Sequence, residues 1–426
     1  MPERRLRVLV IASHPVQYAA PVYRLMAQDA KLELEVAYCS LRGAEAGHDP
    51  EFGRSVKWDV PLLDGYKWTH VANRGSGGES FFGQYNPAMR KLIREGRFDA
   101  VLCQLSYLRC TFWIAYFAAL SRRTEFLFGT DASSMEARDG QKWKVAGKRL
   151  AWPLLFRMSS QVLTASSAGF DMMRSLGIPE GRISMTLDTV DNDWWSSQAA
   201  RVDRDAVRAA WGLDGDEKIV LFCGKLQPWK RPLDVLHAFA SACISRSTLL
   251  FAGDGALRPS IEAEASALGV GDRVRMLGFA NQSQLPAVYR ASDVMVIPSE
   301  YEPFGLVVNE AMLCGCVVIA SNKVGAVRDL ISPGRTGFVY PCGDRSALAE
   351  ALRHAFAEPG NLTQIREAAA NRIRQWSPRA SAAALRDAIV GAVEGSTSPK
   401  TSLHRSGDTA DPVLKAKTPV HVGRRA

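Results

Sequence analysis

Residues 294–315 read VMVIPSEYEPFGLVVNEAMLCG, and this stretch decides the fold. It begins with four apolar residues, Val294–Ile297, as a strand buried on both faces does. Pro298 and Pro303 bound a loop, and a helix is expected to open at about Phe304–Leu306. A strand that passes through a short loop into a helix is the repeating unit of an α/β protein with a parallel sheet.

The same alternation of short apolar runs and helix-length segments continues along most of the chain. A polar stretch at 188–193 interrupts it, so we place a domain junction near 190–215. The pattern predicts two parallel-sheet domains of the Rossmann-like kind, each binding ligands beyond the carboxyl ends of its strands. The expected strands are Arg7–Ala12, Leu34–Ala37, Ala100–Cys103, Glu125–Phe128 and Gln161–Thr164, then Lys218–Cys223, Thr248–Ala252, Arg273–Leu277, Asp293–Ile297 and Val317–Ala320.

The predicted domains are 1–190 on the acceptor side and 191–376 on the donor side. A helix at 377–394 is expected to return to the first domain. Residues 396–426 carry six Lys/Arg and two Asp/Glu without apolar periodicity, so they are expected to form a disordered basic tail.

The composition narrows the class of protein. The 426 residues are 47% hydrophobic and 23% charged, which is typical of a folded chain with more than one domain. The most apolar stretch, Cys110–Leu120, is about half as long as a membrane-spanning helix needs to be. The first apolar run is short and is expected to be a strand rather than a signal peptide. Eight scattered cysteines without a CxxC pair indicate reduced thiols and a cytoplasmic protein.

Several catalytic motifs are missing from the sequence. The loop after the first strand, Ser13–Tyr18, contains no G-x-G-x-x-G, which disfavours a hydride-transferring dinucleotide enzyme. No Walker A loop, HExxH zinc motif or G-x-S-x-G nucleophile elbow occurs. We therefore expect no cofactor and no metal.

Two segments carry groups suited to a phosphorylated sugar. A helix that begins directly after the strand at 294–297 offers backbone N–H groups to a phosphate, and Glu302 and Glu310 can accept hydrogen bonds from sugar hydroxyls. The alternative is an ordinary strand–loop–helix with solvated acids. Lys225 and Lys230 follow the strand at 218–223 and can reach a diphosphate; the alternative is a pair of solvated loop lysines.

Together these segments resemble the retaining nucleotide-sugar glycosyltransferases of family 4, the group 1 glycosyltransferases, which have the GT-B fold. The order and spacing of the motifs agree across about 190–345, and the N-terminal half is matched more loosely. The resemblance rests on Glu302–x7–Glu310, Gly224-Lys225-Leu226 with Lys230, Gly253-Asp254-Gly255, Met276–Phe279, Tyr289–Asp293 and Val190-Asp191-Asn192.

The resemblance implies two Rossmann-like domains that face an interdomain cleft, and a role for each matching residue. Lys225, which stands where the family usually has arginine, and Lys230 are expected to hold the donor diphosphate and to assist catalysis. Glu302 is expected to contact the donor sugar and to take part in catalysis, and Glu310 is expected to hold the ribose. Backbone amides of Phe304, Gly305 and Leu306 are expected to meet the sugar and phosphate, and Phe279 is expected to border the base.

The acceptor side departs from the family pattern. His14, Gln17 and Tyr18 lie in a first loop that is often Gly-Gly in the family, and we expect them on the acceptor side. The family often has a histidine where this chain has Asp131, so Asp131 and His14 are both candidates for the catalytic group. The alternative for Asp131 is a helix or turn cap, because Asp-Ala-Ser-Ser favours capping.

The predicted function is metal-independent, retaining transfer of a sugar from a nucleotide-sugar to an acceptor hydroxyl on a glycan, a lipid-linked sugar or a small molecule. An epimerase or phosphorylase of the same architecture is the alternative, and a nucleic-acid-binding protein, prompted by the net charge of +9, is a distant one. The base, the sugar and the acceptor stay open.

The basic, aromatic stretch 142–157 allows two interpretations. It is either a peripheral contact with the inner face of a membrane or a helix packed on its own sheet with solvated lysines.

Overall fold

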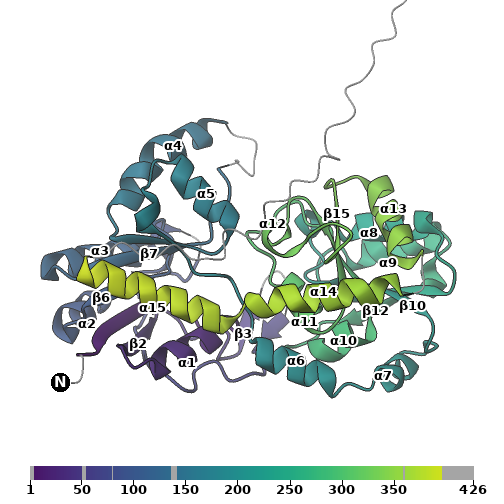
Figure 1. Cartoon of the computed structure of the whole chain (residues 1–426), viewed down its shortest axis with the longest axis horizontal. Helices are drawn as coiled ribbons and strands as arrows, with labels where there is room; N and C mark the ends of the chain where they lie inside the picture. Colours follow the sequence, from purple (N-terminus) through teal and green to yellow (C-terminus); the bar gives the residue numbers. More distant parts are fainter. Residues whose placement is uncertain (1–3, 50–53, 79, 136–141, 358–359, 396–426) are drawn as a thin grey trace, which may run out of the picture.

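The computed structural model describes residues 4–49, 54–78, 80–135, 142–357 and 360–395. It contains two large sheets with helices on both faces of each, and the two layered units lie side by side along the longest axis (Figure 1). Strands pair in parallel within both sheets. The two Rossmann-like domains predicted from the apolar runs are therefore present. The predicted disordered tail lies outside the described residues.

The N-terminal sheet has seven strands in the order β5-β2-β1-β6-β7-β8-β9. Its central strand contains Val8, Leu9, Val10 and Ile11, all fully buried, because helices cover both faces. The strands are β1 (Leu6–Ala12), β2 (Leu32–Tyr38), β5 (Lys67–His70), β6 (Ala100–Cys103), β7 (Glu125–Thr130), β8 (Gln161–Thr164) and β9 (Ile183–Met185), with a separate hairpin of β3 (Gly47–Asp49) and β4 (Arg54–Val56).

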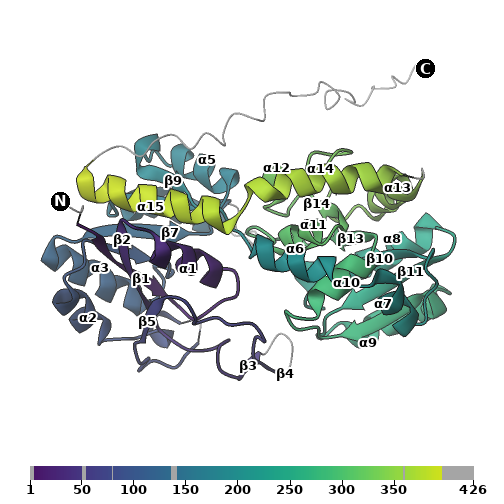
Figure 2. The same ribbon diagram turned by 60° about the horizontal axis from the view of Figure 1, so that its bottom comes forward.

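Two groups of helices cover the N-terminal sheet. One face is packed by α2 (Met89–Gly96), α3 (Cys110–Arg122), α4 (Lys142–Arg157) and α5 (Ser167–Ser175). The other face is packed by α1 (Ala20–Gln28) and by the last helix, α15 (Pro378–Glu394), through Leu385, Ala388 and Ile389. The last described helix thus helps to build the core of the N-terminal domain (Figure 2).

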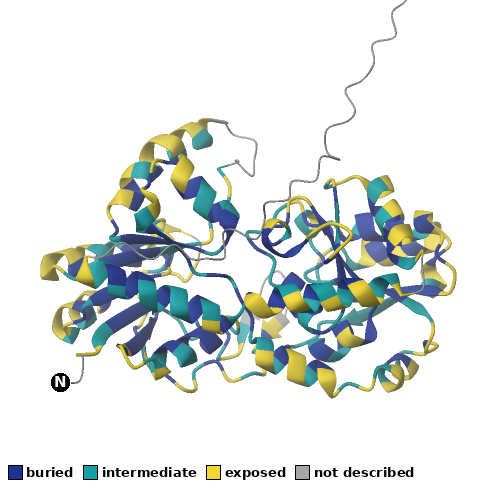
Figure 3. Ribbon diagram, in the orientation of Figure 1, coloured by how far each residue is buried: buried dark blue, intermediate teal, exposed yellow. Residues whose placement is uncertain are grey.

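The C-terminal sheet has six strands in the order β12-β11-β10-β13-β14-β15. These are β10 (Lys218–Cys223), β11 (Ser247–Ala252), β12 (Val274–Gly278), β13 (Val294–Ile297), β14 (Val317–Ser321) and β15 (Phe338–Tyr340). Its helices are α6 (Asn192–Ala200), α7 (Arg204–Ala210), α8 (Pro232–Ala242), α9 (Arg258–Ala267), α10 (Leu285–Ala291), α11 (Val307–Leu313), α12 (Val327–Leu330), α13 (Arg345–Phe356) and α14 (Asn361–Gln375). Figure 3 shows the buried strands enclosed between helices whose outer sides are exposed.

The chain passes between the domains twice, once after β9 and once between α14 and α15. At the second passage Pro378 begins α15, and the Ser377 side chain accepts a hydrogen bond from the Ala380 N–H. A Ser cap followed by Pro favours a new helix start, so α14 and α15 remain two helices rather than one.

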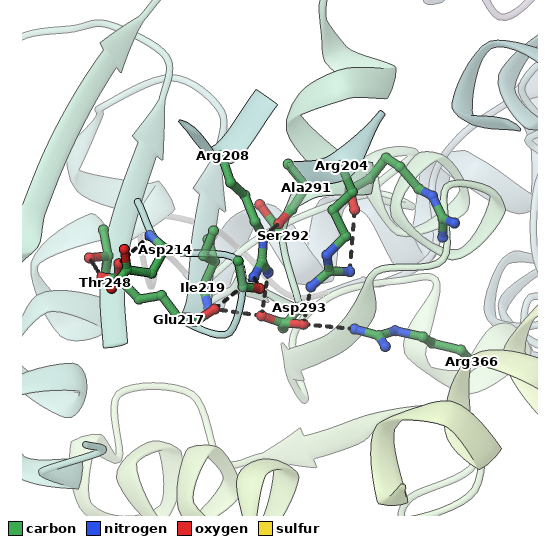
Figure 4. A network of polar contacts seen from close by, with 12 residues as sticks. Arg204, Arg208, Asp214, Glu217, Ile219, Thr248, Ala291, Ser292, Asp293 and Arg366 are labelled. Atoms are coloured by element: carbon green, nitrogen blue, oxygen red, sulfur yellow. Dashed lines mark hydrogen bonds and ion pairs between the residues drawn. The ribbon is translucent and has the colours of Figure 1, made fainter. Parts of the chain in front are cut away.

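A buried carboxylate, Asp293, holds three elements of the C-terminal domain together. It forms ion pairs with Arg208 at 2.9 Å, Arg204 at 2.5 Å and Arg366 at 3.0 Å, and it accepts from the Ile219 N–H at 2.9 Å (Figure 4). Burial by itself favours a raised pKa, but the guanidinium groups and the backbone N–H outweigh it and lower the pKa of Asp293. The motif Tyr289–Asp293 therefore has a structural role, which joins α7, α14 and β10 at the start of β13.

We expect Asp293→Asn to destabilise the fold by about 3–5 kcal/mol at neutral pH, because it leaves the buried Arg208 without its counter-charge. The pKa of Asp293 is lowered in the folded state. Asp293 therefore stabilises the fold fully above the ordinary pKa of an aspartate, and this stabilisation is lost as the pH falls through the pKa that Asp293 has in the folded state. The measurement is urea unfolding at several pH values. Asp216→Asn, which breaks the exposed pair of Asp216 with Arg246, is the control and changes stability by less than about 1 kcal/mol. Equal losses in the two variants contradict the prediction.

Candidate functional site

Both sheets reverse their strand order next to their first strand. In the N-terminal sheet the reversal lies between β1 and β6, and in the C-terminal sheet between β10 and β13. Parallel sheets bind ligands in the crevice beyond the carboxyl ends of the strands at such a switch point. Two neighbouring cavities occupy these positions, and Tyr18 lines both.

The first cavity, of about 450 Å³, belongs mainly to the N-terminal domain. Its walls come from the loops after β1, β6 and β7, from the first passage between the domains, and from α15. Polar groups in its lining are Ser13, His14, Tyr18, Tyr23, Gln104, Ser106, Tyr107, Thr130, Asp131, Thr186, Asp188, Thr189 and Ser381.

The second cavity, of about 240 Å³, lies between the domains. Gln17 and Tyr18 line it from the N-terminal side. From the C-terminal side it is lined by Lys230, Glu302, Gly305, Leu306 and Glu310. The structure thus brings together five of the residues predicted for donor binding and two of those predicted for the acceptor side.

The loop that carries Glu302 is held by the segment after β14. The Gly325 N–H donates to the Glu302 carbonyl at 3.1 Å, and the Ala326 N–H donates to the Phe304 carbonyl at 2.8 Å. A Cβ on Gly325 would lie 2.0 Å from the Pro303 oxygen, so only glycine allows this approach. Gly305 has a φ of +100°, which a residue with a side chain rarely adopts. Gly325 is a supporting residue that the sequence analysis missed.

Lys230 and Glu302 form an ion pair in the wall of the second cavity. The Ser299 hydroxyl donates to the same carboxylate oxygen at 3.0 Å. Both charged side chains are mostly buried, so the pair is poorly screened by water. A diphosphate that takes over the Lys230 ammonium would free the Glu302 carboxylate for another partner.

The loop that carries Lys225 is fixed by the Gly253–Gly255 turn. The Leu226 N–H donates to the Asp254 carbonyl at 2.9 Å, and a Cβ on Gly253 would lie 1.9 Å from the Gly224 oxygen. The two glycines of the turn therefore let two backbone loops touch. Lys225 is half-buried in this loop, but it lines neither of the two cavities described here.

Two predicted aromatic residues differ in placement. Phe279 follows β12 and lies outside both cavities. The ring of Phe304 is buried and stacks on Trp376 at 5.6 Å between centroids and 12° between planes. Phe304 therefore serves the core with its side chain, which leaves only its backbone for a ligand.

Glu310 lies at the bottom of the second cavity and accepts a hydrogen bond from the Tyr289 hydroxyl at 2.8 Å. Burial raises the pKa of Glu310 to about 7, and the Tyr289 hydrogen bond opposes part of that shift. Near neutral pH the carboxyl group can therefore gain or lose a proton when a ligand displaces water.

His14 in the first cavity is an uncharged imidazole at neutral pH. Burial, together with the charge of Arg42, lowers the pKa of His14 to about 4. Its Nδ1 lies 2.8 Å from the Ser13 hydroxyl. His14 can exchange hydrogen bonds with a ligand, but it brings no positive charge to a diphosphate.

Asp131 shares the first cavity with a second carboxyl group, Asp188. Burial, together with the nearby charge of Asp131, raises the pKa of Asp188 to about 7. The described residues directly after Asp131, 132–135, are not helical, so Asp131 does not cap a helix there. The domain junction was expected near 190–215, after a polar stretch that begins at Asp188, and Asp188 was not predicted as a site residue, although it follows β9 at the same sheet edge.

No group of three or more His, Cys, Asp or Glu side chains suited to a metal ion occurs within the described part of the chain.

Part of the chain matches a family of known proteins. Residues 203–372 match the family model described as glycosyl transferases group 1. The C-terminal domain is thus similar to the group 1 glycosyltransferases. The sequence motifs predicted this family, and the match covers the six strands of the C-terminal sheet.

Curated relatives match part of the chain. D-inositol 3-phosphate glycosyltransferase of Rhodococcus opacus is 40% identical over 173 residues, which is 38% of this chain and 38% of the relative. The enzyme of that name from Rhodococcus jostii is 33% identical over 243 residues, or 54% of this chain and 52% of the relative. The chain thus matches about half, or less, of the length of these relatives.

Solved structures match over both domains. Anabaena HepE in complex with UDP and glucose superposes with a TM-score of 0.69 and 19% identity, covering 91% of this chain and all of that one. Sucrose-phosphate synthase from Thermosynechococcus elongatus superposes with a TM-score of 0.66 and 21% identity, covering 92% of this chain and all of that one. The fold is the GT-B architecture that the resemblance implied.

The raised pKa of Glu310 predicts a pH dependence of stability that can be isolated. A carboxyl group whose folded pKa is raised stabilises the fold fully below its unfolded pKa, and this contribution is lost as the pH rises toward about 7. Between about pH 4.5 and 7, the free energy of unfolding of the wild type is expected to fall by up to about 1.4 kcal/mol per pH unit relative to that of Glu310→Gln. Above about pH 7 the difference between the two proteins is expected to stay constant. Denaturant unfolding of both proteins across this range checks it. Parallel curves throughout the range would contradict the prediction.

Proposed function

We propose that this protein is a configuration-retaining glycosyltransferase that moves a sugar from a nucleotide-sugar donor to an acceptor hydroxyl, without a metal ion. The observation that carries the proposal is the interdomain cavity in which Lys230, Glu302 and Glu310 face Gln17 and Tyr18. The complex of HepE with UDP and glucose supports a nucleoside diphosphate sugar as the donor class.

Each charged group has a place in the proposed reaction. Sugar transfer builds positive charge on the sugar ring and negative charge on the departing diphosphate, which must be stabilised. Lys230 and Lys225 supply positive charge to the diphosphate. Glu302, released from Lys230, accepts hydrogen bonds from the donor sugar, and Glu310 accepts them from the ribose.

The acceptor binds in the adjoining cavity beside Asp131. In a transfer on the front face of the sugar, the departing phosphate oxygen takes the proton of the attacking hydroxyl. The Asp131 carboxylate then orients that hydroxyl and faces the positive charge of the ring. Asp188, whose pKa is raised to about 7 by burial and then by the charge of Asp131, lines the same cavity.

Product analysis tests the proposed reaction against its alternatives. A thermal-shift panel of UDP-, GDP- and ADP-sugars first finds the donor, because a ligand that binds the native state raises Tm. We expect product only when a sugar acceptor is added, with the anomeric configuration kept, and also in the presence of EDTA. Sugar released to water or phosphate, or a donor sugar that is epimerised, would contradict transfer. The epimerase outcome is included because a structure described as a putative UDP-N-acetylglucosamine 2-epimerase from Listeria monocytogenes also superposes on this chain. Its TM-score is 0.62 at 14% identity, and the match covers 93% of this chain and 98% of that one.

Removal of a donor-side lysine is expected to weaken binding of the bare nucleoside diphosphate. Lys225→Ala and Lys230→Ala each delete one charged hydrogen bond of about 1.5–3 kcal/mol, so affinity falls by about tenfold or more. Calorimetric titration with UDP, or with the diphosphate that the panel selects, measures this. Lys91→Ala, on the exposed side of α2, is the control. Unchanged affinity in both donor-side variants would overturn the proposed diphosphate site.

The two glutamates are expected to separate binding from turnover. Glu302→Gln removes the partner of Lys230, so the bare diphosphate binds as tightly as before or more tightly, while turnover falls. Glu310→Gln weakens the bare diphosphate, because the ribose loses a charged acceptor. Titration and turnover on the same preparations test the pair. Identical affinities in the two variants would show that the roles are assigned wrongly.

Asp131→Asn is expected to fold and to bind the diphosphate normally while it loses most transfer activity. The amide keeps the size of the carboxylate but removes the charge that faces the sugar ring. His14→Ala serves as the comparison, because His14 lines the same cavity without a charge. Near-normal transfer by Asp131→Asn, together with a large loss in His14→Ala, would move the catalytic role to His14.

A further inference from the structure

The helix α4 has apolar side chains on two opposite sides. Trp152, Leu155 and Phe156 point into the core of the N-terminal domain and are buried. Trp143, Leu150 and Leu154 are 71%, 78% and 65% exposed. At 3.6 residues per turn, positions i, i+7 and i+11 fall on one side of a helix, so these three side chains form a single outer stripe. We call Trp143, Leu150 and Leu154 the α4 stripe.

Packing on the sheet and exposure of an apolar surface therefore occur in the same helix. The two interpretations that the sequence allowed for 142–157 do not exclude each other. Pro153 lies inside the helix without ending it. On the same face of the sheet, α3 exposes Phe117 and Leu120, each at 58%.

The charges around the α4 stripe have one sign. All described charged side chains of α4 are basic (Lys144, Lys148, Arg149 and Arg157), and the sequence of α4 contains no Asp or Glu. Lys148 also lies 5.0 Å from the ring of Trp152, so its stem lies along the helix surface. Exposed Trp and Leu flanked by Lys and Arg are what a helix lying in the interface of an anionic membrane presents.

The buried side of the same helix reaches the first cavity. Trp152 and Phe156 line that cavity, and the Trp152 indole N–H donates to the Tyr107 hydroxyl in its wall at 2.8 Å. A surface that meets the α4 stripe is thus separated from the cavity by one helix, about 10 Å across. None of the described helices is long and apolar enough to cross a membrane.

We infer that the α4 stripe and its flanking lysines and arginines dock the protein on the surface of an anionic lipid bilayer, with the first cavity facing an acceptor carried by a lipid. The docking stands on the exposed side chains and their charges alone. The lipid-linked nature of the acceptor rests in addition on the proposed transfer function.

Vesicle flotation of the full chain tests the docking. We expect the protein to float at low salt with vesicles of phosphatidylcholine and phosphatidylglycerol, and not with phosphatidylcholine alone, because basic residues require an anionic surface. The triple variant Trp143→Ser, Leu150→Ser, Leu154→Ser is expected to lower the partition by about tenfold or more, since it removes the apolar area that enters the interface.

Two controls keep the result interpretable. The double variant Phe82→Ser, Leu268→Ser removes exposed apolar side chains outside α3 and α4 and is expected to float like the wild type. The rise in Tm produced by UDP, or by the diphosphate that the panel selects, is measured on every variant. An unchanged rise shows that the fold and the donor site are intact, so a loss of flotation is then not a failure of the proposed function.

Three outcomes would overturn the docking. The first is a wild type that does not float with anionic vesicles at low salt. The second is a triple variant that floats as well as the wild type. The third is a wild-type dimer that the triple variant converts to a monomer, since a second copy of the chain would then cover the α4 stripe.

Discussion

The arrangement of the two domains depends on the contacts of one buried indole, Trp376. Its ring stacks on Phe304, and its N–H donates to the Asp188 carbonyl at 2.7 Å. Asn192 adds hydrogen bonds from its amide to the carbonyls of Ile373 and Trp376. These contacts join the first passage between the domains, the second passage, and the loop that carries Glu302. A ligand site made from both domains needs such a fixed joint, because a small displacement of one wall removes hydrogen bonds from the other.

Much of the fold could be predicted because its strands are nearly continuous apolar runs. Both faces of each sheet are covered, so runs such as Lys218–Cys223 stand out against the polar loops and helices. The donor loop was recognisable for a related reason: a buried strand, two prolines and a helix follow one another within a short segment of sequence. Two short strands at edges of the sheets were not predicted: β5 has one apolar residue, Trp68, among four, and β15 has only three residues.

The remaining features of the site depend on contacts between residues far apart in sequence. The ion pair of Lys230 and Glu302 joins two loops 72 residues apart. Gly325 matters only because Pro303 lies against it. Asp188 becomes a carboxyl group of the first cavity because β9 ends beside β8, which places it near Asp131. Local sequence patterns contain none of this information, since each residue type is ordinary until its neighbour is known.

The two cavities differ in charge, and the difference is consistent with a direction for the proposed transfer. In the interdomain cavity the ammonium group of Lys230 is already paired with the Glu302 carboxylate. A diphosphate that binds there replaces Glu302 as the anionic partner of Lys230, so the Lys230 charge is never buried without a partner. Carboxyl groups, Asp131 and Asp188, and an uncharged His14 line the other cavity. The lining of the interdomain cavity contains two cations, Arg24 and Lys230, beside the acids Asp191, Glu302 and Glu310, whereas the described lining of the other cavity contains no Lys or Arg. A diphosphate is therefore better stabilised beside Lys230 than beside Asp131. A donor with its diphosphate toward the C-terminal domain and its sugar toward Asp131 meets this condition, whereas the reverse orientation does not.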